Sequence, residues 1–334
     1  MLTNRAAKTI ATLLATVASW SGRTASAADV GVAHSGCEDV DARWPPSLEG
    51  YEPTRFGYTK QGDDVPFIDF TVSIKVQLLR SPFCHWFPRD TVRLYLTFTG
   101  RFGFYLGTRP SSPVIAKNYN PKLLWRWIPD PESTLSAETG GRRREYKSYF
   151  DFAYAHDSNG QSISTAEQYD GLVRQVSNPN YALDYISRGW DYLDFATKQA
   201  FSGETARVNI YPELKYFLRH GLLQGVPEEY HSWEGGSPGQ PRHAYDGILM
   251  EVDYLPYAGR SSNSPRWDDT LRLALKYMTG YEPIARYNTV RGEIGLTVLG
   301  LPLNLWAQDG YMNSLARYYF KTTSVGLEVR LTQW

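Results

Sequence analysis

Residues 68–79 read "IDFTVSIKVQLL", and apolar and polar side chains alternate along most of this stretch. In an extended strand, successive side chains point to opposite faces of the sheet. One face would carry the apolar members Ile68, Phe70, Val72, Ile74, Val76 and Leu78. The opposite face would carry Asp69, Thr71, Ser73, Lys75 and Gln77. The stretch is therefore predicted to be a strand with one apolar face and one polar face.

The same alternation recurs along the rest of the chain, clearly in "VRLYLTF" at 92–98 and "SVGLEVRLT" at 324–332, and more weakly elsewhere. We expect about twelve strands of roughly ten residues, the number and length typical of bacterial outer-membrane barrels. They are predicted to begin near residues 51, 67, 91, 118, 148, 187, 206, 247, 270, 290, 302 and 323. A soluble β-sandwich is the alternative that the alternation alone leaves open.

The amino-acid composition favours the barrel over the sandwich. The chain has 24 Tyr, 14 Phe and 10 Trp, and outer-membrane barrels place such residues in girdles at both membrane interfaces. Its last residue, Trp334, is also aromatic, as is common for bacterial barrels. The sequence therefore predicts an all-β fold: a twelve-stranded antiparallel transmembrane β-barrel of the bacterial outer membrane, with its N and C termini in the periplasm.

The first residues have the three-part pattern of a secretory signal peptide. Arg5 and Lys8 precede the apolar stretch "TIATLLATVASW", and "TASA" at 24–27 offers small residues for cleavage. We expect a signal peptide over 1–27, a periplasmic segment over 28–50 and the barrel over 51–334; a cytoplasmic N-terminal helix is the alternative. Because residues 1–27 hold three basic and no acidic residues, the rest carries 32 basic against 35 acidic residues. A net charge of −3 for this part of the chain does not indicate binding to nucleic acid.

The two cysteines lie on the same side of the predicted topology. Cys37 precedes the first strand and Cys84 lies in the turn after the second, so both are expected in the oxidising periplasm. A disulfide between them is plausible, although spacing alone does not establish one.

Residues 148–162, "SYFDFAYAHDSNGQS", place a histidine and a serine at the end of an aromatic strand. By parity, His156 and Ser158 share the face of Phe150, Phe152 and Tyr154, which we expect to contact lipid. In the following strand, near 187–198, Asp191 can share that outward face. Serine needs a base to become a good nucleophile, and a carboxylate can orient a histidine base. On these residues alone, ordinary turn chemistry before Asn-Gly remains the alternative.

Two motifs in order, "YAHDSNGQS" at 154–162 and "SRGWDYL" at 187–193, resemble the outer-membrane phospholipase A family. That family has His-x-Ser-Asn-Gly followed by Ser-Arg-x-Trp-Asn. "SSPVIAKNYNPKLL" at 111–124 and "GYMNSLARYYFKTTSVGLEVRL" at 310–331 resemble two further blocks of the family. The resemblance runs, with gaps, from about residue 67 to the C-terminus.

The resemblance implies a calcium-dependent hydrolase of membrane phospholipids and lysophospholipids, active as a homodimer. Ser158 would be the nucleophile and His156 the general base. Asp191 stands where the family has asparagine, and the Gly160 N–H would donate to the oxyanion. The implied calcium ligands are Ser187, the backbone carbonyl of Gln161 and Ser111 of the partner subunit.

Two departures from the family pattern bear on this expectation. An insert, 163–186, separates the motif at 154–162 from the motif at 187–193. This insert either folds away from the site or covers it. Gly100 stands at the nearest match to a glutamine that the family buries in its dimer interface, so a dimer of this chain would lack that contact. A catalytically inactive channel or structural barrel is the first rival reading, and a soluble exported esterase is the second.

Overall fold

The computed structural model describes residues 48–80, 91–109, 113–130, 134–136, 144–146, 148–203, 205–224, 231–234, 240–256, 271–299 and 301–331. The expected signal peptide, Cys37, Cys84, Ser111 and Trp334 lie outside the described residues. Among the helices that are described, none is long and apolar enough to cross a membrane.

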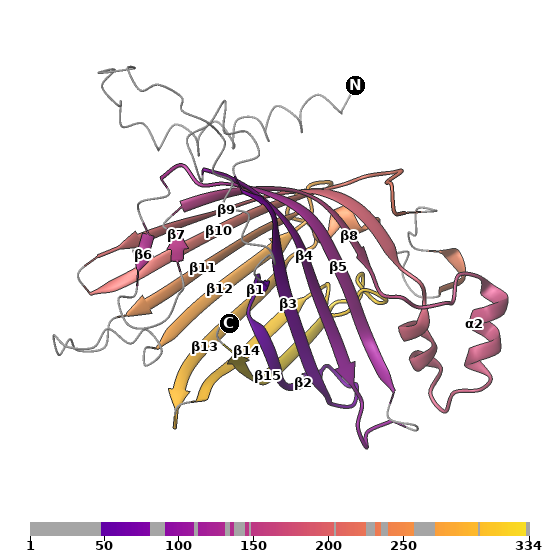
Figure 1. The fold of residues 1–334 in the computed structure, drawn as a ribbon. Coiled ribbons are helices and arrows are strands. Elements are labelled where there is room, and N and C mark those ends of the chain that lie inside the picture. The colour runs from indigo at the N-terminus through magenta and orange to yellow at the C-terminus, as the bar shows by residue number, and fades with distance from the viewer. Residues whose placement is uncertain are drawn as a thin grey trace, which may run out of the picture. The chain divides into compact units, whose positions relative to one another are not determined.

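Twelve antiparallel strands form a closed sheet. Figure 1 labels these strands in the ribbon. Each strand pairs with its neighbours, and β4 pairs with both β3 and β5, so the ring has no free edge. The strands of the ring are β2 Thr54–Gln61, β3 Phe67–Arg80, β4 Val92–Phe104, β5 Val114–Trp127, β8 Ser148–Ser158, β9 Gly189–Ser202, β10 Ala206–Phe217, β11 Ile248–Pro256, β12 Arg272–Thr279, β13 Thr289–Val298, β14 Leu301–Gly310 and β15 Thr322–Leu331. The predicted twelve-stranded antiparallel barrel is confirmed, and the alternative of a soluble sandwich is wrong.

Shorter elements extend the barrel or fill its connections. β1 Leu48–Gly50 pairs with β3 beyond the end of β2, so the sheet begins three residues before the predicted start. β6 Thr134–Ser136 and β7 Arg144–Tyr146 form a hairpin between β5 and β8. The helix α2 Ala166–Val173 and the 3₁₀ helix η1 Pro179–Tyr185 lie between β8 and β9. Two 3₁₀ turns, η2 Ser232–Glu234 and η3 Arg242–Ala244, lie between β10 and β11.

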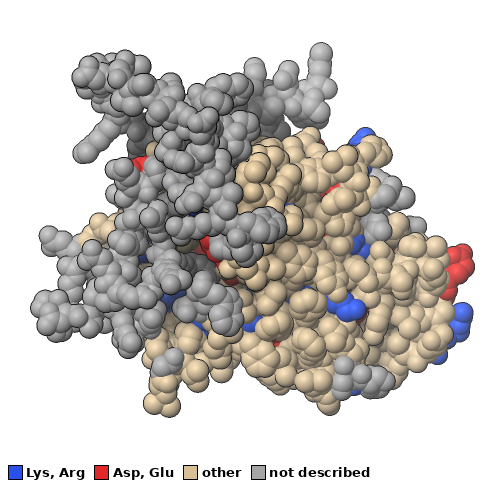
Figure 2. Space-filling model, in the orientation of Figure 1, with Lys and Arg blue, Asp and Glu red and all other residues tan. Residues whose placement is uncertain are grey.

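The outer wall of the barrel is apolar and its inner face is polar. In β15, Val325 and Leu327 are 48% and 50% exposed, whereas Ser324 and Glu328 on the other face are buried. The described part of the face in Figure 2 accordingly carries few charged residues. A soluble protein would bury its apolar face, so this inverted arrangement calls for lipid around the wall. The chain is thus an outer-membrane type of transmembrane β-barrel.

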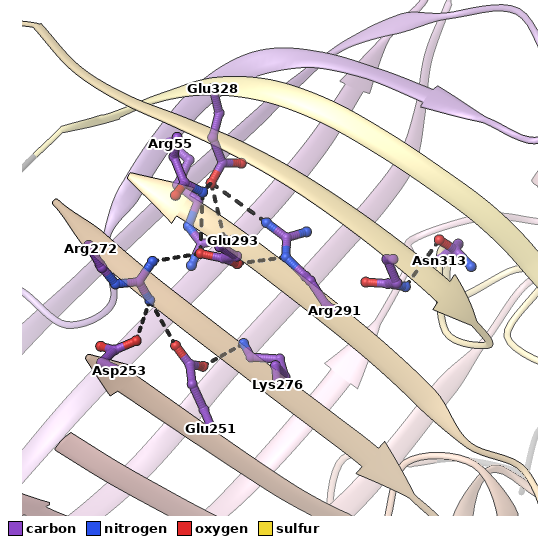
Figure 3. Close-up of polar contacts among 11 residues, drawn as sticks. Arg55, Glu251, Asp253, Arg272, Lys276, Arg291, Glu293, Asn313 and Glu328 are labelled. Atoms are coloured by element: carbon purple, nitrogen blue, oxygen red, sulfur yellow. Dashed lines mark hydrogen bonds and ion pairs between the residues drawn. The ribbon is translucent and has the colours of Figure 1, made fainter. Parts of the chain in front are cut away.

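The lumen contains a network of buried charges, drawn in Figure 3. Glu293 of β13 lies 2.7 Å from Arg272 of β12 and 2.6 Å from Arg291 of its own strand. Arg55 of β2 reaches both Glu293 and Glu328 of β15, at 3.8 and 3.4 Å. Buried charges are costly without partners, and these pairs join β2, from the start of the chain, to β12, β13 and β15 near its end.

Replacing Glu293 with glutamine tests this network. The change leaves Arg55, Arg272 and Arg291 without their shared carboxylate in a site where Glu293 is 2% exposed. We expect the free energy of unfolding to fall by about 2–4 kcal/mol, measured by urea titration in phospholipid vesicles. The matched control is Asp309→Asn, whose pair with Lys321 is more than half exposed; it should leave the unfolding midpoint unchanged. Equal midpoints for both variants would contradict a structural role of the network.

Candidate active site

The predicted pair of strands, β8 and β9, lie side by side with a register that joins the candidate residues. His156 is the direct cross-strand partner of Asp191, and Ser158 is the partner of Gly189. On the same face, Phe152 and Phe195 are 39% and 38% exposed on the outer wall. The side chains of His156 and Asp191 therefore lie on the outward face of the barrel.

The imidazole of His156 is held by the carboxylate of Asp191. The distance from His156 Nδ1 to Asp191 Oδ1 is 2.6 Å, and the Asp191 side chain is fully buried while that of His156 is 16% exposed. An Nδ1–H that donates to Asp191 leaves Nε2 without a proton, which is the tautomer that a general base needs.

The Ser158 side chain and the Nε2 edge of the imidazole both lie next to Gly189. A Cβ built on Gly189 would lie 3.6 Å from His156 Cε1, 4.0 Å from His156 Nε2 and 3.8 Å from Ser158 Cβ. Glycine thus leaves open the space between the hydroxyl and the base. No hydrogen bond joins these two described side chains, and such bonds are commonly loose before a substrate binds.

Sequence reasoning missed the groups that surround Asp191. Its Oδ2 accepts hydrogen bonds from Tyr154 Oη at 2.5 Å, from the backbone N–H of Leu223 at 2.7 Å and from that of Gln224 at 3.1 Å. The alternation that predicts an outward-facing His156 also predicts an outward-facing Tyr154, so this partner of Asp191 could have been found from the sequence. The contact with the segment after β10 could not have been found in this way, because residues 218–224 carry no periodic pattern and are distant in sequence from Asp191.

Asn159 joins the two sequence motifs, 154–162 and 187–193, through hydrogen bonds. Its Oδ1 accepts from the N–H groups of Arg188, at 2.9 Å, and Gln161, at 3.3 Å, while its Nδ2 donates to the carbonyl of Ile186 at 2.7 Å. The next residue, Gly160, has a φ of 58° and lies against the Tyr119 ring. A left-handed conformation with an aromatic ring beneath it favours glycine, so the backbone turns sharply just after Ser158.

The residues implied as calcium ligands were tested by their chemistry and position. The hydrogen bonds of Asn159 bring the segments of Gln161 and Ser187 to the same turn. Hydroxyl and backbone carbonyl oxygens suit calcium, and these are the oxygens that Ser187 and Gln161 would offer. These donors fit the ion in kind, but they are neutral. Within the described ranges no group of three His, Cys, Asp or Glu residues that could hold a metal was found.

The insert forms a small unit of its own beside the site. A parallel bridge between Ile163 and Ile186 closes its base, and both pack with Leu183. Asp184 of the insert pairs with Arg109, from the turn after β4, at 2.7 Å and with Arg317, from the loop before β15, at 2.8 Å. Burial raises the pKa of Asp184, although both arginines oppose this. The insert is thus fastened to neighbouring loops at one end of the barrel, where Figure 1 shows α2.

Gly100, at the place of the family's interface glutamine, lies between two phenylalanine rings. A Cβ there would lie 3.0 Å from the Phe102 ring and 3.1 Å from the Phe98 ring, so a side chain at this position would require both rings to shift. The outer wall at this point is therefore aromatic, and a dimer formed through it would lack a buried polar contact from residue 100.

Solved structures of outer-membrane phospholipase A have a similar fold. The Escherichia coli protein aligns with a TM-score of 0.52 and 17% identity over 84% of this chain and 93% of its own. An active-site mutant of it gives 0.54 and 18%, over 88% and 95%. The Salmonella typhi protein (OMPLA), solved as a dimer with bound calcium, gives 0.53 and 18%, over 86% and 93%. No protein-family model matches the chain, and no curated protein matches it in sequence. At this identity the likeness concerns the fold.

Proposed function

We propose that this barrel is an outer-membrane phospholipase A that hydrolyses acyl esters of glycerophospholipids and lysophospholipids. The observation that carries the proposal is the outward position of His156 and Asp191, joined at 2.6 Å, with Ser158 beside the imidazole. A hydroxyl, a base and a carboxylate on a lipid-facing wall have a membrane ester within reach, whereas a soluble ester has no comparable route to them. The experiment is a lipid-release assay on refolded protein, with the nucleophile variant argued in the Discussion.

The proposed reaction is acyl transfer through serine. Ser158 Oγ attacks the ester carbonyl carbon while His156 Nε2 takes the hydroxyl proton, and Asp191 stabilises the imidazolium. The Gly160 N–H donates to the oxyanion that forms. As the C–O bond breaks, His156 returns the proton to the leaving alkoxide and the acyl group stays on Ser158. Water, deprotonated by His156, then releases the fatty acid and restores the hydroxyl.

Ser187 and Gln161, with Ser111 of a second subunit, would hold calcium, which when bound supplies positive charge near the oxyanion. The chain's homodimerisation belongs to this proposal, and its support is the fold shared with a protein solved as a calcium-bound dimer. Gly100 removes one polar contact from such an interface. We therefore expect a weaker dimer than one with a buried glutamine, and an activity that rises with protein density in the membrane.

Replacing Ser187 with alanine should weaken calcium binding by removing one oxygen ligand. We expect the calcium concentration for half-maximal lipid release to rise about tenfold, equivalent to about 1.4 kcal/mol, with equilibrium dialysis reporting binding directly. The control is Ser177→Ala, an exposed serine of the insert. An unchanged calcium dependence in Ser187→Ala would remove Ser187 from the ligand set, and activity that survives a chelator would remove calcium from the reaction.

A channel or structural barrel with an inactive site is the alternative function. The lumenal network argues against the channel, because Arg272 and Glu293 with their partners are largely buried in the interior of the barrel. Ion conductance in planar bilayers, without lipid release in calcium, would favour the channel. We further propose that the end of the barrel carrying the insert faces outward from the cell and that both termini are periplasmic.

A further inference from the structure

The chain that leaves β10 folds back over Asp191 and binds its main chain as well as its side chain. The N–H of Leu218 donates to the carbonyl of Asp191 at 2.9 Å, and the N–H of Asp191 donates to Gln224 Oε1 at 3.0 Å. Together with the bonds from Leu223 and Gln224 to the carboxylate, one short segment contacts every polar group of Asp191. This residue is 0% exposed although it lies on the outer wall.

Three of the four groups that meet the Asp191 side chain are donors, and the fourth, His156 Nδ1, donates in the tautomer that a general base needs. The N–H groups of Leu223 and Gln224 have no lone pair to offer. The Tyr154 hydroxyl accepts from the Leu222 N–H at 2.6 Å, so its own proton is directed to Asp191 Oδ2. His156 Nδ1 supplies the fourth contact, on Oδ1. An ionised carboxylate accepts at both oxygens and donates at neither, so it matches this set.

Gly221 allows the segment to come this close. A methyl group built on Gly221 would overlap the carboxylate of Asp191, including its Oδ2 and Cγ. The Asp191 side chain is buried and held by four hydrogen bonds, so moving it would break bonds that nothing else replaces. A substitution at residue 221 therefore displaces either the segment or the carboxylate.

The same segment presents apolar side chains beside the outer wall. Leu222 is 88% exposed and Leu223 is 61% exposed, and Tyr216 at the end of β10 is 53% exposed. These positions continue the apolar wall that includes Phe195 of β9. Two adjacent leucines on a barrel wall fit the acyl region of a lipid bilayer just below its headgroups.

We propose that residues 221–224 form a lipid-anchored clamp that fixes the Asp191 carboxylate and, through it, the orientation of His156. Leu222 and Leu223 insert into the bilayer, and the backbone donors of the clamp then hold Asp191. Tyr154 and Gly221 are positioning residues, because they act through Asp191 rather than on the substrate. The catalytic consequence rests on the proposed function, whereas the clamp and its effect on the histidine do not.

The test of the clamp is Gly221→Ala in the full-length protein refolded into phospholipid nanodiscs. Its readouts are the Nδ1–H resonance of His156 in protein labelled with ¹⁵N-histidine, assigned with His156→Gln, and the separate values of kcat and KM. We expect the resonance to be lost or moved, and kcat to fall about 100-fold with KM changed less than about twofold. The control is Gly203→Ala, where a Cβ meets only Ala206 O at an ordinary 3.6 Å; it should match wild type.

Tyr154→Phe covers the case in which Gly221→Ala fails to assemble. It removes one donor to Oδ2 without touching the backbone, and we expect the His156 resonance to shift and kcat to fall about tenfold. An unchanged resonance and kcat in either folded variant would overturn the clamp. If wild type releases no fatty acid but its resonance responds to these changes, the clamp stands and the proposed function fails.

The lipid anchor is tested by the double variant Leu222→Ser/Leu223→Ser in the same nanodiscs. Hydrogen exchange of the backbone amides of residues 222–224 should accelerate at least tenfold, because the clamp loses its hold on the bilayer. Leu299→Ser is the matched control, since Leu299 is 98% exposed in the turn after β13 and should leave exchange at 222–224 unchanged. Equal exchange in wild type and the double variant would show that lipid does not hold the clamp.

Discussion

Replacing Ser158 with alanine should lower calcium-dependent release of fatty acid by at least ~10³-fold. The methyl group keeps the strand and its neighbours in place but provides no oxygen to accept the acyl group. Because Ser158 is only partly buried at the end of β8, we expect the variant to assemble like wild type. The measurement compares release from phospholipid in mixed micelles for both proteins, with calcium and with chelator.

A control variant and an assembly check make this a specific test of Ser158 as the nucleophile. Ser162→Ala, an exposed serine four residues further along the chain, should retain full activity and so controls for changes to the turn. Assembly of each variant can be followed by the heat-dependent shift of folded barrels on gels. Equal release from wild type and an assembled Ser158→Ala would remove Ser158 from the reaction.

Replacing Asp191 with asparagine should lower kcat by about 10²–10³-fold, although the family that the chain resembles uses asparagine here. If the amide oxygen faces Leu223 and Gln224, its NH₂ group meets His156 Nδ1 and forces the proton to Nε2, so the base is lost. If the oxygen faces His156, the NH₂ group opposes two backbone N–H donors. The first orientation therefore gives the wrong imidazole tautomer, and the second leaves buried donors unpaired.

The test is a pair of steady-state measurements on Asp191→Asn and on Asp170→Asn, a conservative change at an exposed position of α2. The first should lose kcat with little change in KM, and the second should match wild type. If Asp191→Asn keeps its kcat within about threefold, the claim that the clamp requires an acceptor-only side chain is wrong.

The fold was predictable because its main determinant is local. The alternation in 68–79 marks β3, and the same period marks the ends of β8 and β9 well enough to assign their faces. Two adjacent antiparallel strands joined by one connection must pair, so His156 and Asp191 were expected on one patch of wall, where the structure has them. The catalytic roles of these residues remain predictions.

The rest depends on contacts that no local pattern encodes. The clamp reaches Asp191 from the connection after β10, and its donors are backbone groups that any sequence would provide. Glu293 pairs with Arg272 of the neighbouring strand β12 and with Arg291 of its own strand, whereas Arg55 of β2 reaches it only once the sheet has closed with its particular stagger. Nothing in the sequence explains why aspartate stands at 191 where the resembled family has asparagine, whereas the donors that converge on its Oδ2 from Tyr154, Leu223 and Gln224 match a carboxylate.

The most direct measurement of the central claim is mass spectrometry after reaction with a long-chain alkyl fluorophosphonate in lipid micelles. This reagent phosphonylates serines that a neighbouring base activates, and its chain carries it to a wall that faces lipid. A single adduct on Ser158 in the presence of calcium, absent from His156→Gln and strongly reduced in Asp191→Asn, is the predicted result. An unmodified Ser158 in wild-type protein, or labelling that does not depend on His156, would contradict the proposal of an outward-facing serine hydrolase.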